Sequence, residues 1–404
     1  MRTYPLGDVS KFYAGASLPI GESFNGQPDG YLLVRVSDMS LPGNERTLKK
    51  SQRWSATPGA RSATCPAGSL IFPKRGGAIG TNKKRIVERP CILDPNLMAV
   101  EPTPGQLDGD YLYHWFQSFD LSQIANGSSI PQLNKKDLTP LRLPLPPISM
   151  QRKIAEILNH LDTLRAKRRE AISLLEDLSQ SIFRDMFGDV VKNDRGWDEH
   201  RTLGDAAFIV SGITKGRRAP NGPLRSVPYM AVANVQERRL DLSAVKEIEA
   251  TADEIDRYRL LEDDLLLTEG GDPDKLGRGT LWRNELPECI HQNHIFRVRL
   301  REGSGIDPIF LNWLVASNRG RSYFLRSAKQ TTGIASINAT QLKNFPLLIP
   351  PIKLQQDFGA RIRHLEQCKS SHGEHLSQLD ALFASIRHRA FRGELWSIQA
   401  ASAT

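Results

Sequence analysis

Two segments of the chain carry apolar side chains at the spacing of a long amphipathic helix. From Met150 to Phe187 no proline or glycine interrupts the sequence, and Gly188 follows where a helix-ending residue is expected. Apolar side chains recur in this segment every seven residues, as they do in coiled coils, with Arg168 as an interruption. A second segment after Pro351 has the same spacing and is interrupted by His372. We predict two long helices, the first about 57 Å long, from the usual rise per residue.

The apolar stripes of these two helices need partners. We expect the helices to pack antiparallel against each other, with a pseudo-twofold axis near their polar middle. The alternative is that each helix lies on its own domain. The positions expected in the helix seam are Ile154, Leu161, Leu175, Ile182, Phe358, Leu365, Leu379 and Ile386. A second apolar line on the first helix comprises Ile157, Leu164, Ala171 and Leu178.

The two helices belong to an internal repeat. The segment "PLPPISMQRKIAEIL" before the first helix is echoed by "PLLIPPIKLQQDFGARI" before the second. Residues 130–187 align with residues 334–391 without a gap, at an offset of 204, and the copies share Gln151 and Gln355. Fainter likenesses upstream are "LGD" twice, "VRVSDM" with "MAVANV", and "SLIFPKRGG" with "DLLLTEGG". Such a repeat predicts two similar units.

Each half outside the helices combines short strand-like runs with amphipathic helices, such as "YLLVRVSDM" and "DYLYHWFQSF" in the first half. We predict an α+β fold: two pseudo-repeated α+β domains joined and spaced by two long antiparallel coiled-coil helices. The expected boundaries are 1–145 for the first domain, 146–190 for the central shared helix, 191–349 for the second domain, 350–396 for the C-terminal shared helix, and 397–404 for a tail.

Composition narrows the class of partner. The 404 residues exceed what one core usually serves, and the formal net charge of +9 favours a polyanion such as nucleic acid, although a basic surface can also serve solubility alone. The N-terminus lacks an apolar signal segment and no run is long enough to span a membrane, so we expect a cytoplasmic protein without membrane contact. The four cysteines are scattered without a C-x-x-C pair, which predicts neither a disulfide framework nor a zinc ribbon.

Basic loops are the candidates for contact with nucleic acid. "FPKRGGAIGTNKKR" combines cations with glycines that permit close approach to phosphate, and its polar side chains could reach base edges. "SGITKGRRAP" and "GGDPDKLGRGTLWR" are the candidates in the second half. A solvated charged loop is the alternative for any single residue. The candidates are Lys74, Arg75, Thr81, Asn82, Lys83, Lys84, Arg85, Lys215, Arg217, Arg218, Lys275, Arg278 and Arg283.

This arrangement resembles a known family, the specificity subunits of type I restriction-modification systems. The resemblance covers essentially the whole chain, and its specific part is the doubled segment at 134–151 and 338–355 with the two "LGD" starts. It implies a DNA-reading scaffold with two target-recognition domains, which binds double-stranded DNA at a bipartite, asymmetric site. It also implies docking of two methyltransferase subunits and of restriction subunits. S-adenosylmethionine would bind to the partner methyltransferase, and no cofactor is expected in this chain.

Catalytic motifs are missing from the sequence. "GGDPDKLGRGT" has the wrong spacing for a phosphate loop, and Arg278 stands where the lysine would be. "DPNL", "DPDK" and "DPIF" lack the second proline of the base-gripping motif of amino-methyltransferases. In "CIHQNH", Cys289 and His291 share one strand face and His294 the other, so we expect a structural or DNA-contacting histidine rather than a metal site. His160 and His364 are expected to pack.

We therefore predict a non-catalytic specificity subunit of a methyltransferase/endonuclease complex. The alternative is a stand-alone, sequence-specific DNA-binding regulator, which would explain the charge but has no need of two unlike domains on long helices. An enzyme with its own nuclease or methylase site is the third reading. It has the least support, because the sequence lacks the motifs such a site would need.

Overall fold

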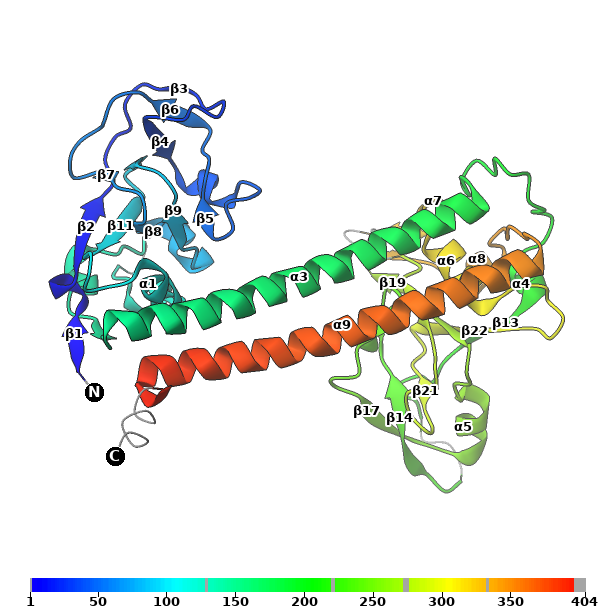
Figure 1. Ribbon diagram of the computed structural model, residues 1–404. Coiled ribbons are helices and arrows are strands. Elements are labelled where there is room, and N and C mark those ends of the chain that lie inside the picture. The colour runs from blue at the N-terminus through cyan, green and yellow to red at the C-terminus, as the bar shows by residue number, and fades with distance from the viewer. Residues whose placement is uncertain (1, 128–129, 219–221, 272–275, 332–333, 396–404) are drawn as a thin grey trace. The chain divides into compact units, whose positions relative to one another are not determined.

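The computed structural model describes all residues except 1, 128–129, 219–221, 272–275, 332–333 and 396–404. The chain divides into two compact units, Met1–Glu170 with Gly373–Thr404 and Ala171–His372. Two long helices, α3 (Ile148–Phe187) and α9 (Ile352–Arg392), are each divided between the units (Figure 1). Both helices lie close to their expected positions. Each unit groups one predicted domain with part of both helices, so the compact units cut across the predicted segments.

The first unit contains two five-stranded sheets and a two-stranded pair. One sheet has the order β2 (Ser10–Ala14), β11 (Leu97–Pro102), β8 (Leu70–Pro73), β9 (Arg85–Val87) and β5 (Thr47–Leu48). The other has the order β3 (Glu22–Ser23), β6 (Arg53–Ser55), β4 (Tyr31–Val34), β10 (Cys91–Leu93) and β7 (Thr64–Cys65). The pair is β1 (Thr3–Pro5) with β12 (Arg142–Pro144), and the short helices are η1 (Leu6–Asp8), η2 (Val36–Ser40), η3 (Gly76–Thr81), α1 (Gly109–Phe116), η4 (Leu121–Ile124) and α2 (Lys135–Leu138).

The second unit has a related set of elements. Its larger sheet has the order β13 (Ala207–Ser211), β22 (Ile295–Leu300), β18 (Leu265–Thr268) and β20 (Gly279–Leu281). Smaller sheets are β17 (Lys246–Ala250), β14 (Arg225–Met230) and β21 (Ile290–His291); β15 (Val235–Gln236) and β16 (Arg239–Leu240); and β19 (Gly270–Gly271), β24 (Ile334–Ser336) and β23 (Lys329–Thr331). The helices are α4 (Leu203–Ala206), η5 (Val232–Asn234), α5 (Ala252–Tyr258), α6 (Pro308–Ala316), α7 (Asn318–Ser327) and α8 (Ala339–Lys343).

The faint upstream sequence likenesses correspond to the same local structure. In each unit a central strand, β11 or β22, pairs antiparallel on both sides, and β4 or β14 pairs parallel with a later short strand. The 3₁₀ helix after β4 starts where the Asp38 carboxylate accepts from the backbone N–H of Arg35 (2.7 Å). After β14, Asn234 accepts from the N–H of Ala231 (2.9 Å). The predicted shared scaffold is therefore confirmed.

The long helices pack antiparallel, because each unit joins the start of one helix to the end of the other. In the first unit, Ile154 and Leu161 share a core with Leu379 and Ile386. In the second unit, Ile182 shares a core with Phe358 and Leu365, while Leu175 is only half-buried. These seams continue into the cores of the domains, which include α1 or α6. The helices therefore pack both against each other and against the domains, so the two alternatives considered from the sequence occur together.

The cross-helix ion pairs occupy equivalent positions of the repeat. In the first unit Arg165 of α3 donates from Nε to the Asp380 carboxylate of α9 (2.5 Å). In the second unit Lys369 of α9 pairs with Glu176 of α3. Lys369 is the repeat equivalent of Arg165, and Glu176 is the equivalent of Asp380. The same two repeat positions thus pair in both units, with the helices that supply them exchanged.

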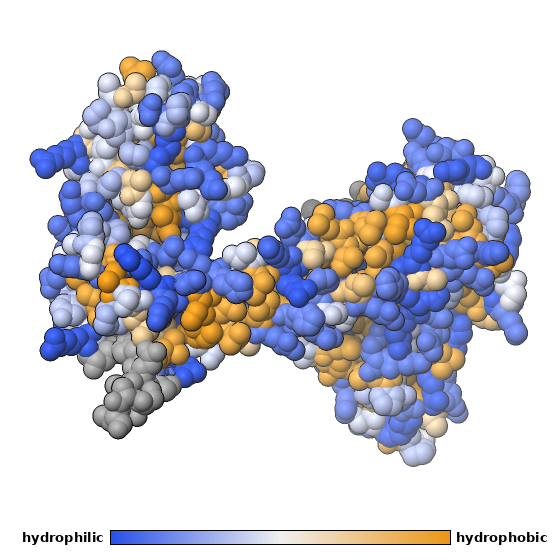
Figure 2. Space-filling view, viewed as in Figure 1, coloured by the Kyte–Doolittle hydropathy of each residue, from blue (hydrophilic) through white to orange (hydrophobic). Residues whose placement is uncertain are grey.

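The second apolar line predicted on α3 is only partly buried, so its assignment as a packing surface is wrong at two positions. Ile157 and Leu178 are 48% and 46% exposed. The buried stripe of the first unit centres on Ile154 and Leu158, and Ile157 lies about 100° round the helix from Leu158. Apolar side chains are visible on the surface of the structure (Figure 2). Leu174 and Leu382 are 60% and 47% exposed. None of the helices among the described residues has the length and apolar character needed to cross a membrane.

Replacing Phe358 with alanine should destabilise the second unit by about 3–5 kcal/mol, because a fully buried ring would leave a cavity. The Phe358 ring lies 5.5 Å from that of Phe183 and 5.5 Å from that of Trp313, centroid to centroid. Denaturant unfolding monitored by tryptophan fluorescence would measure the loss. Leu174→Ala, on the exposed side of α3, is the control and should cost below about 0.5 kcal/mol. Equal losses in the two variants would contradict this packing.

Candidate nucleic-acid interface

The basic loop of the first unit runs from the end of β8 through η3 to β9. Arg75 and Thr81 are exposed, and Lys83 is partly exposed with its Nζ donating to the Ser40 hydroxyl (2.5 Å). Asn82 ends η3 in the left-handed conformation (φ 51°), and its side-chain oxygen accepts from the N–H of Leu121 (3.1 Å). Arg75 and Lys83 are thus the accessible cations of this loop, while Asn82 holds its shape.

The remaining cations of this loop are held by the protein itself. Lys84 is fully buried, and its Nζ donates to the carbonyl of Phe119 (2.8 Å). Burial lowers the pKa of Lys84 to about 8 and also lowers the pKa of Lys74. Arg85 donates from Nε to the carbonyl of Met39 (3.2 Å). Lys84 has no surface with which to contact a phosphate, so it belongs to the core.

The candidates of the second unit divide in the same way. Arg217 makes two hydrogen bonds of 2.6 Å to the Glu254 carboxylate, which raise the pKa of Arg217. Arg283 pairs with Asp263, and Arg278 lines a pocket with its Nε buried. Lys215 and Arg218 are exposed. Lys275 lies outside the described residues. Lys215 and Arg218 are therefore the accessible cations among the described candidates of this unit.

Two arginines that the sequence analysis missed join each domain to its long helix. Arg46 donates from Nη2 to the carboxylate of Asp110 on α1 and to the amide oxygen of Asn159 on α3, both at 2.6 Å. Its guanidinium carbon lies 5.1 Å from the centre of the Tyr113 ring of α1. No motif distinguishes this arginine from its neighbours, so only its position in the fold reveals the contact.

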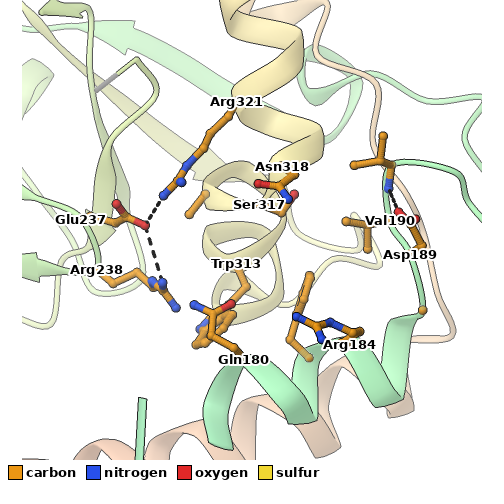
Figure 3. Close-up of a pocket in the computed structure, with 14 residues that line it drawn as sticks. Gln180, Arg184, Asp189, Val190, Glu237, Arg238, Trp313, Ser317, Asn318 and Arg321 are labelled. Carbon is orange, nitrogen blue, oxygen red and sulfur yellow. Dashed lines mark hydrogen bonds and ion pairs between the residues drawn. The ribbon is translucent and has the colours of Figure 1, made fainter. Parts of the chain in front are cut away.

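The corresponding arginine of the second unit is Arg238, in the turn between β15 and β16. Its guanidinium carbon lies 4.2 Å from the centre of the Trp313 ring of α6, and its Nη1 lies 3.5 Å from Glu176 of α3. Figure 3 shows Arg238 beside a pocket of about 350 Å³, with Glu237 between Arg238 and Arg321. The arginine thus faces an aromatic ring of α6, as Arg46 faces one of α1, but its long-helix contact is with α3 and not with α9, the helix that begins in this unit.

The histidines differ from one another. His291 is fully buried, with Nδ1 3.0 Å from the Tyr258 carbonyl and Nε2 3.3 Å from the Val210 carbonyl. His294 is 58% exposed and pairs with Glu269. The described part of the chain contains no group of three or more potential metal ligands. The four cysteines are free. His160 and His364 are exposed, so their predicted packing role is wrong, since they face away from the buried stripes.

Comparison with known proteins shows which proteins the chain resembles. Residues 3–174 match the model of the type I restriction modification DNA specificity domain. The type I restriction enzyme StySPI specificity subunit of Salmonella potsdam is 24% identical over 97% of this chain and 89% of the relative. The chain is therefore similar over nearly its whole length to type I restriction enzyme specificity subunits. The EcoBI specificity subunit of Escherichia coli is 23% identical over 92% of this chain and 81% of its own length.

Solved structures share the fold. The specificity subunit from M. genitalium superposes with a TM-score of 0.60 at 14% identity, covering 96% of each chain. A chain from a structure on complex assembly and conformational transition of the type I system gives a TM-score of 0.51 at 17% identity, covering 97% of this chain and 98% of that one. At these identities the likeness concerns the fold alone.

The stability of the second unit should depend on the protonation of His291. Burial lowers the pKa of His291 to about 4 in the folded chain, from 6.5 for an unperturbed histidine. The unfolded chain therefore binds the proton first. The free energy of unfolding should therefore be highest, with respect to His291, above pH 6.5. It should fall by about 3 kcal/mol as the pH drops towards 4. His291→Gln should remove this contribution from the pH profile, and parallel profiles for the two proteins would contradict it.

Proposed function

We propose that this chain is a specificity subunit, the DNA-reading component of a type I restriction-modification complex, and reads an asymmetric site in two parts. One observation carries the proposal: the two units repeat one scaffold, while their exposed basic loops differ. The first presents Arg75 and Lys83 after β8, and the second presents Lys215 and Arg218 after β13. Cations in such loops supply phosphate contacts, and unlike loops read unlike bases.

The proposed partners follow from the repeated helices. Leu178 of α3 and Leu382 of α9 occupy equivalent positions of the repeat and are 46% and 47% exposed. Equivalent surfaces bind identical partners, which supports two methyltransferase subunits for each chain. Restriction subunits would complete the nuclease. The chain itself would be non-catalytic and without a cofactor, and S-adenosylmethionine would bind to the methyltransferase. The relatives offer no support for a stand-alone regulator.

The salt dependence of DNA binding tests the basic loop of the first unit. Replacing Arg75 and Lys83 together with alanine should lower the slope of log affinity against log salt by about two units, because two phosphate contacts are lost. Lys84→Met, in the same loop, is the matched control. It should weaken folding and leave the slope unchanged, because Lys84 is buried. An unchanged slope in the double variant would remove this loop from the interface.

The methylation pattern tests the proposed function directly. Methylome sequencing of strains with and without the gene should reveal two unlike half-sites separated by an unread spacer, with centres about one helical turn, ~10 base pairs, apart. The unlike loops on a common scaffold are the reason for this expectation. A palindromic or continuous motif would contradict it. Co-purification of a methyltransferase with this chain would in addition distinguish a specificity subunit from a stand-alone regulator.

A further inference from the structure

The glutamine shared by the two repeats makes the same three hydrogen bonds in both units. Gln151 of α3 accepts at Oε1 from the N–H of Asp108 and donates from Nε2 to the carbonyls of Gln106 and Pro146, each at 2.9 Å. Its amide therefore joins the start of the long helix to a chain segment more than forty residues earlier. The side chain is fully buried.

Gln355 repeats this arrangement in the second unit. It accepts from the N–H of Asp307 (2.9 Å) and donates to the carbonyls of Gly305 (3.1 Å) and Pro350 (2.7 Å). It too is fully buried. The arrangement was therefore retained in two units whose exposed loops have diverged.

The backbone N–H that each glutamine holds belongs to the N-cap residue of the domain's own helix. Asp108 caps α1 by accepting from the N–H of Tyr111 (3.0 Å), and Asp307 caps α6 by accepting from the N–H of Ile309 (2.8 Å). One buried amide thus connects the start of a domain helix to the start of a long helix. Because each glutamine side chain is fully buried, its loss would take a hydrogen-bond partner from three backbone groups in the protein interior.

Apolar packing alone would leave the angle between domain and helix loosely specified, because such contacts are not directional. In the first unit the contacts of Gln151 and Arg46 lie at two separate places along α3. In the second unit Gln355 lies on α9, and Arg238 contacts Glu176 of α3. Two directional contacts can fix an orientation that one contact leaves open.

We propose that Gln151 and Gln355 are positioning residues, each of which fixes the orientation of one reading domain on its long helix. The orientation in turn sets the spacing of DNA half-sites that the subunit accepts. The first statement concerns the chain alone, and the second rests on the proposed function. The two can therefore be tested separately.

The first experiment measures spin-label distances in the full chain without DNA. Cys368→Ser removes the partly exposed cysteine, and labels at Lys50→Cys and Lys167→Cys report on the first unit. Labels at Lys246→Cys and Gln367→Cys, in a separate protein, report on the second unit. Pulsed electron paramagnetic resonance then gives the distance distribution in each unit.

Gln151→Met preserves volume and helix propensity but removes all three hydrogen bonds. It should broaden or shift the distance distribution of the first unit and leave that of the second unchanged. Gln355→Met should do the reverse. Gln378→Met, at an exposed position of α9, is the matched control and should change neither. Unchanged distributions in a folded Gln151→Met protein would overturn the proposal.

A second variant guards against simple unfolding. If thermal melting shows that the first unit of Gln151→Met is unfolded, Gln151→Glu retains the acceptor for the N–H of Asp108 and is used instead. It should broaden or shift the distances while the unit stays folded. If neither glutamine variant yields a folded first unit with altered distances, the residue serves stability alone and the proposal fails.

The second experiment uses the assembled methyltransferase and DNA substrates with spacers of altered length. In Gln151→Met, discrimination between the native spacer and one base pair more or less should fall on the order of tenfold. A purely structural glutamine would lower the active fraction equally on all spacers. Altered distances with unchanged spacer preference would refute the link to DNA spacing. A lack of specific binding by the unmodified subunit would instead refute the proposed function and leave the distance result standing.

Discussion

The whole chain depends on one constraint, namely that an amphipathic helix of about forty residues cannot leave its apolar face in water. α3 and α9 have 40 and 41 residues, and both meet the constraint in the same way. In each unit, part of one helix packs against the opposite part of the other, and α1 or α6 contributes to the same core. The equivalent ion pairs Arg165–Asp380 and Lys369–Glu176 show that the pairing is the same in both units.

Directional contacts then supply what the apolar seam lacks. Hydrophobic burial stabilises the pairing, but its free energy changes little when the helices rotate slightly. A buried amide with three hydrogen-bond partners loses those bonds on such a rotation. Gln151 and Gln355 provide such contacts at the helix starts, and Arg46 and Arg238 provide a second set against Tyr113 and Trp313. The two units use glutamine at equivalent positions of the repeat, whereas the arginine contacts differ. Arg46 contacts Asn159 in the first half of α3, and Arg238 contacts Glu176 in the second half of that helix.

Burial also decides which charges can meet DNA. The net charge of +9 predicts an anionic partner, yet the charge of a residue does not say where its side chain lies. Lys84 and Arg217 are as cationic as Arg75 and Lys215 in the sequence. In the structure Lys84 donates to a core carbonyl, and Arg217 is paired with Glu254. The proposed interface therefore rests on fewer side chains than the basic loops contain.

The sequence by itself determined the repeat, the two long helices and the α+β character of each half, because periodicity and an ungapped offset of 204 are local properties of the chain. It also singled out Gln151 and Gln355 as shared, without assigning them a contact. Only the tertiary structure decided that Ile157 faces outward and that Arg46 reaches α1 and α3. The physical reason is that burial and hydrogen-bond partners come from segments distant in sequence, and the spacing within one segment does not encode them.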